Sequence, residues 1–244
     1  MSSAAVFCFC LSLAGLVQAQ TYKVGVQSLD YFPIAAAAPP DHVFKGYARE
    51  VLDRFAQREG IRFDYVALPP RRMFIEYWAG KLDFAFPDNP NWDTEEKTKY
   101  PTLAYSQPLL RFYDAVFTVP EKAEAPAAQL KKLGVLLGWT PWKFSERIEE
   151  GAIQLQTAPN PHSLIQMAIS GRVDGANLAE PVARYHLRLR GTPDALMANL
   201  EWMPQRQSTY HLSSIRHSDL LKRFDQYLRE DDAHLARLRS KYGL

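Results

Sequence analysis

Two kinds of hydrophobic pattern alternate along the first half of the chain. Short apolar runs predict strands at 23–27, 61–66 and 82–86. Between them, Tyr47, Val51, Leu52 and Phe55 recur at helical spacing. A second, shorter helix is expected over 72–79, and Gly60 and Gly80 supply the two helix stops. This β-α-β-α-β order predicts parallel strands covered by helices.

The pattern then pauses and begins again. A polar, turn-rich segment (87–108), a strand (114–119) and a linker-like stretch rich in proline and alanine (120–128) separate the two series. The second series predicts strands at 133–137, 154–157 and 175–178 and helices at 141–149, 161–170 and 180–189. A strand at 209–212 and helices at 218–228 and 231–241 complete the chain. We expect two α/β lobes joined at a hinge, with a binding cleft where the carboxyl ends of their strands face each other.

The N-terminus predicts export. Residues 1–19 carry no charge, hold an apolar run and end in Val17-Gln18-Ala19, which is typical of a signal peptide cleaved before Gln20. The apolar run is too short to span a bilayer, which takes about 20 residues. Both cysteines, Cys8 and Cys10, lie inside it. We therefore expect a periplasmic protein without thiols.

Composition and motifs exclude several classes of function. The chain has 29 Lys and Arg against 27 Asp and Glu, a balance that argues against a nucleic-acid partner. Its six histidines lack the spacing of zinc ligands, and neither a phosphate-binding loop nor a Gly-x-Ser-x-Gly nucleophile turn is present. We expect no catalytic activity, cofactor or metal.

Six short motifs carry a family resemblance. They are Phe44-Lys45-Gly46-Tyr47, Gly80-Lys81-Leu82-Asp83, Tyr105-Ser106-Gln107-Pro108, Leu133-Gly134-Val135-Leu136-Leu137-Gly138, Gly171-Arg172-Val173-Asp174-Gly175 and Lys241-Tyr242-Gly243. In this order they resemble the family 3 extracellular solute-binding proteins, which serve polar amino acid uptake and share the type II periplasmic binding fold. The resemblance implies a first lobe at 20–115 and 207–244, a second lobe at 116–206, and a hinge of two crossing strands.

The resemblance also implies where a ligand would lie. The family places an aromatic side chain against the ligand after the first strand, where this chain has Tyr31 and Phe32. It binds carboxylate at a strand-to-helix turn, here Trp139 and Thr140, with Pro141 in the first helical turn. Ordinary core packing, lobe packing or helix capping would account for the same residues.

Two departures separate this chain from the amino acid binders. The arginine that pairs with the α-carboxylate is replaced by Lys97, which cannot form a planar two-pronged pair. The acid that receives the α-ammonium falls at Ala179, and Glu180 lies one position later.

Other polar residues are candidates to replace these two anchors. Arg72 opens a helix at a position where related proteins point an arginine into the cleft, and Asp88 and Asn89 come directly after a strand. A surface charge and turn formation are the alternative interpretations.

We therefore expect a monomer that captures one small polar solute, amino-acid-like or a related organic ion, and delivers it to an ABC-type permease. Two alternatives stay open. One is a sensory module that reports ligand to a membrane receptor. The other is an enzyme resembling the periplasmic cyclohexadienyl dehydratases, in which a Glu or His in the cleft would act as acid or base.

Overall fold

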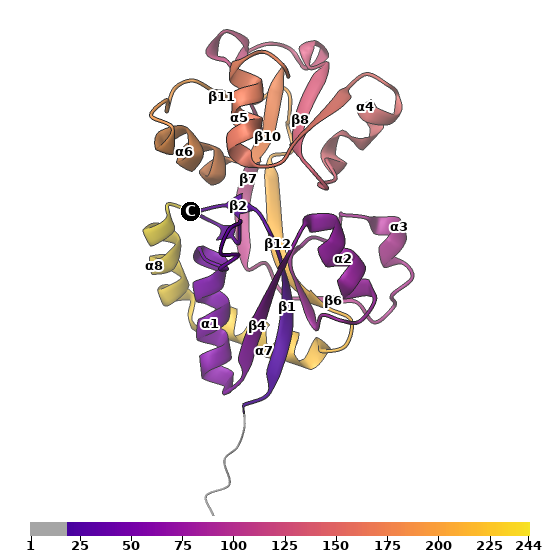
Figure 1. Cartoon of the computed structure of the whole chain (residues 1–244), viewed down its shortest axis with the longest axis vertical. Coiled ribbons are helices and arrows are strands. Elements are labelled where there is room, and N and C mark those ends of the chain that lie inside the picture. The colour runs from indigo at the N-terminus through magenta and orange to yellow at the C-terminus, as the bar shows by residue number, and fades with distance from the viewer. Residues whose placement is uncertain (1–18) are drawn as a thin grey trace, which may run out of the picture.

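The computed structural model describes residues 19–244, so the predicted leader lies outside the described residues except for Ala19. The elements form two halves stacked along the long axis of the molecule, with a narrower waist between them (Figure 1). Within residues 19–244, no helix combines the length and the apolar character that a membrane crossing requires.

The lower half in Figure 1 holds both ends of the described chain. Its elements are β1 (Thr21–Gln27), β2 (Asp30–Tyr31), β3 (Ala35–Ala36), α1 (Tyr47–Glu59), β4 (Arg62–Leu68), α2 (Pro70–Trp78), β5 (Phe84–Asp88), α3 (Thr94–Lys97), β6 (Ala104–Tyr105), α7 (Ser218–Glu230) and α8 (Asp232–Tyr242). β1 pairs in parallel with β4 on one side and with β5 on the other. This confirms the parallel order predicted for the first series.

The upper half is built by the middle of the chain. Its elements are β8 (Lys132–Leu136), α4 (Ser145–Glu149), β9 (Gln154–Ala158), α5 (Pro161–Ile169), β10 (Gly175–Ala179), α6 (Glu180–Leu189) and β11 (Met197–Asn199), with short 3-10 turns at Pro120–Lys122, Ala127–Gln129 and Trp142–Phe144. β8 pairs in parallel with β9 and β10, so the second series also has the predicted pairing.

Two long strands connect the halves. β7 (Leu110–Thr118) and β12 (Gln207–Ser214) run through the waist in Figure 1. The first part of β7 pairs with β12, and its second part, from Asp114 onward, pairs with β10. The continuous sheet order is therefore β4-β1-β5-β12-β7-β10-β8-β9.

The two halves repeat one structural device. In each, a glycine with positive φ follows a helix, Gly80 after α2 and Gly171 after α5, and an aspartate comes three residues later. Asp83 Oδ2 accepts the backbone N–H of Lys23 at 2.8 Å, at the start of β1. Asp174 Oδ2 accepts the backbone N–H of Lys132 at 2.8 Å, at the start of β8. The Gly-x-x-Asp motifs thus fix the amino end of each parallel sheet.

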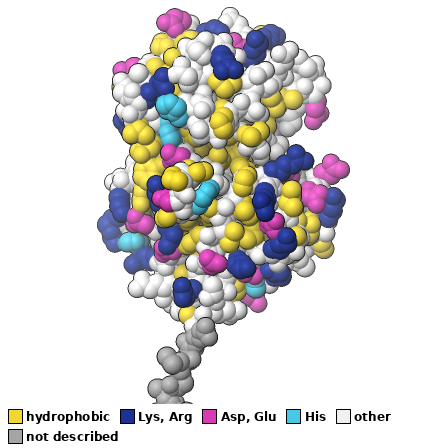
Figure 2. Space-filling model, in the orientation of Figure 1, with side chains coloured by type: hydrophobic (Ala, Val, Ile, Leu, Met, Phe, Trp, Pro, Cys, Tyr) yellow, Lys and Arg dark blue, Asp and Glu magenta, His cyan; other side chains and the backbone are white. Residues whose placement is uncertain are grey.

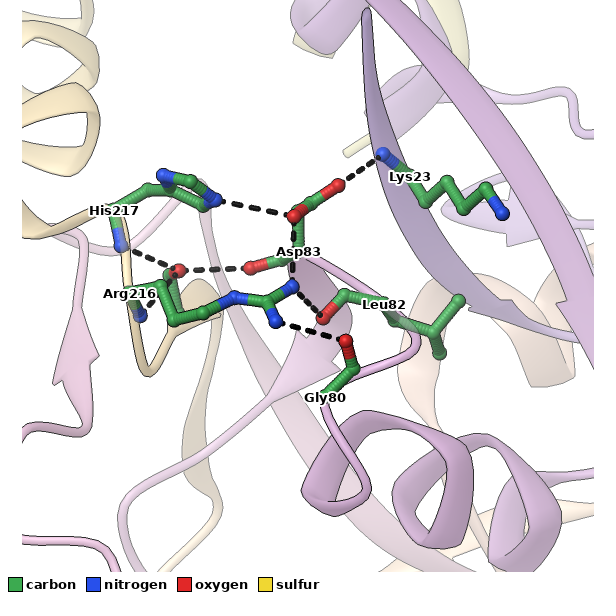
Figure 3. Close-up of polar contacts among 7 residues, drawn as sticks. Lys23, Gly80, Leu82, Asp83, Arg216 and His217 are labelled. Carbon is green, nitrogen blue, oxygen red and sulfur yellow. Dashed lines mark hydrogen bonds and ion pairs between the residues drawn. The ribbon is translucent and has the colours of Figure 1, made fainter.

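Figure 3 shows this device in the lower half, where two further residues join it. Arg216 donates to Asp83 Oδ1 at 2.8 Å and to the carbonyls of Gly80 and Leu82, and His217 Nε2 lies 3.1 Å from the same carboxylate. Burial acts to raise the pKa of Asp83, but the hydrogen bonds from the Lys23 backbone and His217 hold it below its usual range. Asp83 is therefore a charged anchor between the start of β1 and the end of β12.

The helix predicted over 141–149, which begins beside the cleft, differs from the structure. The helix expected over 141–149 is a 3-10 turn at Trp142–Phe144 followed by α4, and Pro141 has φ −79° and ψ 62°, outside the helical region. The expectation of an α-helix N-terminus at Thr140 and Pro141 is wrong. The reason is local, because the ψ of Pro141 lies outside the helical region and delays the first helical residue.

Candidate functional site

A cleft of about 720 Å³ lies between the two halves. It is bounded by α2 and the start of α3 on the lower side, by the segment between β8 and α4 on the upper side, and by β7 and β12 at its base (Figure 1). Its apolar lining is mostly aromatic: Phe74, Trp78, Trp92, Phe112, Trp139, Trp142 and Tyr210. Its polar lining includes Gln27, Asp114, Thr140, Lys143, Asn177 and Ser208. A volume of this size accommodates a small organic molecule.

The molecular surface is consistent with this arrangement. On the face shown in Figure 2, hydrophobic side chains reach the surface around the waist where the halves meet, whereas charged side chains gather over the lower half. An apolar region with a few convergent polar groups is the usual character of a ligand site.

Trp139 and Thr140 line the cleft, as expected from the sequence. Trp139 Nε1 donates to Gln27 Oε1 at 3.1 Å, and the Thr140 hydroxyl lies 3.2 Å from Asp93 Oδ1. Gln27 and Asp93 belong to the lower half, so both contacts bridge the waist. The role of these two residues in binding stays a prediction.

Tyr31 and Phe32 lie behind the cleft rather than in its lining. Tyr31 is buried, its ring centroid lies 4.8 Å from that of Trp139, and its hydroxyl accepts the backbone N–H of Ala179 at 2.8 Å. Phe32 packs against Tyr185 at 4.6 Å between ring centroids. Tyr31 therefore supports the Trp139 ring and ties the two halves together.

Arg72 and Glu180 are engaged in ion pairs outside the cleft lining. The Arg72 side chain is 67% exposed and pairs with Glu76, while its neighbour Arg71 lines the cleft. Glu180 accepts from Arg206 at 2.6 Å and pairs with Arg184. Neither residue belongs to the cleft lining in this structure, and their role as anchors stays a prediction.

Asp88, Asn89 and Lys97 form a buried cluster inside the lower half. Lys97 Nζ donates to Asp88 Oδ1 at 2.8 Å and to the carbonyl of Asn89 at 2.6 Å. The Asn89 side chain donates to the carbonyl of Thr209 at 2.8 Å, which fixes the loop against β12. Burial raises the pKa of the Asp88 carboxyl, and the charge of Lys97 opposes that rise. Asp88 Oδ2 is buried without a hydrogen-bond partner among the described residues. None of the three residues belongs to the cleft lining.

The polar base of the cleft is a pair that sequence reasoning missed. Lys143 Nζ lies 3.1 Å from Asp114 Oδ2, and both side chains are largely buried. Burial raises the pKa of Asp114, and Lys143 opposes this. The partners are 29 positions apart and come from β7 and a 3-10 turn, so no local motif marks them. Within residues 19–244, no group of three His, Cys, Asp or Glu side chains could hold a metal ion.

Trp92 was also missed. It belongs to the polar loop after β5, which by composition predicts only turns, yet its ring lines the cleft and lies edge-on to Tyr210 with centroids 5.8 Å apart. The sequence signal that could have identified Trp92 as a cleft residue is a single tryptophan within a polar segment.

Comparison with known proteins identifies the fold. No protein-family model matches this sequence, and no curated protein matches it. Three similar solved structures are an ancestral arginine-binding protein bound to arginine (TM-score 0.70, 17% identity, 91% of this chain and 97% of that chain), a substrate-binding protein of an amino acid ABC transporter (0.71, 13%, 91% and 98%) and an ancestral amino acid-binding protein described as a precursor of cyclohexadienyl dehydratase (0.69, 18%, 91% and 94%). The chain has their two-lobed α/β fold, which confirms the predicted fold class.

Proposed function

We propose that this protein captures a small solute in the cleft between its two halves and holds it by hinge closure. The observation that carries the proposal is the aromatic cleft of about 720 Å³, bounded by two α/β halves between which the chain crosses in β7 and near the start of β12. In this proposal the mobile units are the predicted lobes, 20–115 with 207–244 and 116–206.

Contacts across the waist support closure as the holding step. Trp139 with Gln27, Thr140 with Asp93, and Ala179 with Tyr31 each join one half to the other. All three involve polar groups that water can replace when the halves separate, so opening leaves no unpaired buried group. A solute that contacts both halves would add its own interactions to the closed state and shift the population toward it.

Delivery to an inner-membrane ABC permease is the physiological role that we propose. The likeness to a substrate-binding protein of an amino acid ABC transporter supports it, as does the exported leader predicted from residues 1–19. A periplasmic location and a monomeric state belong to the same proposal.

A solute screen by thermal denaturation tests solute capture directly. We expect one chemical class among amino acids, amines, organic acids and ring compounds to raise the melting temperature of the purified protein. A solute at 100 times its dissociation constant adds about 2.7 kcal/mol to the free energy of unfolding. No shift with any class would count against the proposal.

A dehydratase-like enzyme is the second candidate, and Asp114 is the observation that favours it. Its carboxyl lines the cleft and has a raised pKa because it is buried, so it could hold a proton for transfer. One of the similar structures is described as a precursor of cyclohexadienyl dehydratase. Turnover of prephenate or arogenate by the purified protein would establish this function.

A further inference from the structure

Tryptophan is concentrated in the cleft. The chain has five tryptophans, and four of them line the cleft: Trp78, Trp92, Trp139 and Trp142. The fifth, Trp202, is buried in a separate hydrophobic cluster of the upper half. Large flat side chains at a cleft wall offer broad apolar faces for a ligand.

Two of these rings lie near each other across the waist. Trp92 comes from the lower half and Trp139 from the upper half, and their ring centroids lie 6.5 Å apart with an interplanar angle of 34°. Because carbon atoms pack best at roughly 3.5–4.0 Å, a flat ring inserted between two others needs a spacing of about 7–8 Å. A small opening of the hinge would give that spacing.

Both rings are held in place from behind. The Trp139 ring packs on Tyr31 and is tied to Gln27 through Nε1, and the Trp92 ring rests on the buried Tyr210. Side chains fixed in this way lose little conformational freedom when a ligand binds, which favours tight stacking.

The charged groups of the cleft are largely paired with each other. Lys143 pairs with Asp114 within the cleft, and Glu96 pairs with Lys99, which lies outside the lining. Arg71 also lines the cleft. Lys97 and Glu180, which sequence analysis considered as anchors for an amino acid, are engaged elsewhere. The lining therefore offers aromatic faces and a polar base in which the Asp114 carboxylate is compensated by Lys143, and its guanidinium, that of Arg71, belongs to an exposed residue.

We infer that the solute carries a planar aromatic ring, which stacks between Trp92 and Trp139 while its polar edge meets Asp114 and Lys143. This inference rests on the proposed function and specifies its substrate class. The inference specifies the aromatic ring of the solute, and titration with neutral, cationic and anionic probes determines the charge of the solute. The cleft volume leaves room for a ring larger than that of a simple phenyl compound.

Calorimetric titration of the purified protein with matched probes tests the inference. Three indole probes differ in charge: indole-3-carboxamide, tryptamine and indole-3-acetate. Their saturated counterparts are cyclohexanecarboxamide, 2-cyclohexylethylamine and cyclohexylacetate, and arginine and glutamine represent amino acids. We expect at least one indole to bind at least tenfold more tightly than its saturated counterpart and than either amino acid, because only a flat ring stacks on both tryptophans.

Variants locate the binding to the two rings. Trp92→Leu and Trp139→Leu are each expected to weaken the best probe by about tenfold or more. Trp139→Phe keeps a flat ring without the bond to Gln27 and is expected to retain most of the affinity. Tyr113→Leu removes an aromatic ring that is 50% exposed and outside the cleft lining, and is expected to change nothing. Unchanged melting curves would show that each variant is folded.

Each contrary outcome has a distinct meaning. Failure of all three indoles to bind overturns the inference, as does unchanged affinity in both leucine variants. Tight binding of arginine or glutamine without ring binding overturns the ring clamp and leaves solute capture intact. Failure of these probes together with a solute screen that gives no thermal shift contradicts the proposed function as well.

Discussion

Replacing Lys97 by methionine is expected to lower the free energy of unfolding by about 4 kcal/mol, which would be among the largest effects of any single substitution in this chain. Lys97 is the cation beside Asp88, whose side chain is fully buried. Without Lys97 the carboxylate has no compensating charge within hydrogen-bond distance, and a charge cannot stay in an apolar interior without one. Urea denaturation of the purified variant measures the loss.

The loss should depend on pH. Burial raises the pKa of Asp88 in the folded protein, and removal of Lys97 takes away the charge that opposes this rise. A group whose pKa is raised on folding favours the folded state below its unfolded pKa, and this favour is lost as pH rises through the folded pKa. The deficit of Lys97→Met is therefore expected to be smaller near pH 4–5 than at neutral pH.

Two further variants control this prediction. Asp88→Asn added to Lys97→Met removes the uncompensated charge and should restore a large part of the lost stability. Lys99→Met removes an exposed lysine that lies two positions after Lys97 and pairs with Glu96. It should change stability by no more than about 0.5 kcal/mol. Equal losses for Lys97→Met and Lys99→Met would contradict a structural role for the Asp88–Lys97 pair.

Substituting Gly175 by alanine is expected to cost about 3 kcal/mol, because the added methyl group has no space. A Cβ atom at this position would lie 2.4 Å from Cγ1 of Val116, 3.1 Å from the Trp202 ring and 3.2 Å from the carbonyl oxygen of Phe117. The first and third belong to β7, so the close approach of β10 to the connecting strand depends on this glycine.

Gly134→Ala is the matched control. Its closest obstacle is the tip of the Leu164 side chain at 2.6 Å, a flexible group that can move, and the next contacts are 3.2 Å or more away. We expect a loss of no more than about 1 kcal/mol, measured by the same urea denaturation. A larger loss for Gly134→Ala than for Gly175→Ala would show that the packing of β10 on β7 is not the constraint.

Local signals in the sequence account for most of the fold. The helix predicted over 180–189 has the bounds of α6, because Pro181 suits a first helical turn and Gly191 follows its end. Gly60 has φ 65° and closes α1, as its position after a periodic segment predicted. Two of the motifs that carry the family resemblance, those at 80–83 and 171–175, have a structural role. Their aspartates, Asp83 and Asp174, anchor equivalent strands in the two halves.

The site was harder to predict, because it depends on pairings between distant segments. Lys97 occupies the position where the resemblance expects the carboxylate-binding arginine. Its ammonium group instead donates to Asp88, a partner that no spacing rule identifies. Trp92 lies in a segment whose composition predicts only turns. Lys143 and Asp114 are 29 positions apart in the sequence, and the fold brings them together. Trp139 and Thr140, at the turn indicated by the family resemblance, do line the cleft, although the helix begins later and their role in binding stays a prediction.

Small-angle X-ray scattering with and without a bound solute tests the central claim most directly, since capture between two hinged halves requires them to approach each other. With a solute identified by thermal shift, we expect the radius of gyration to decrease on saturation, because a solute that contacts both halves shifts the population toward the closed state. Secondary structure measured by circular dichroism should stay the same. An unchanged radius of gyration in the presence of a solute that demonstrably binds would contradict the account.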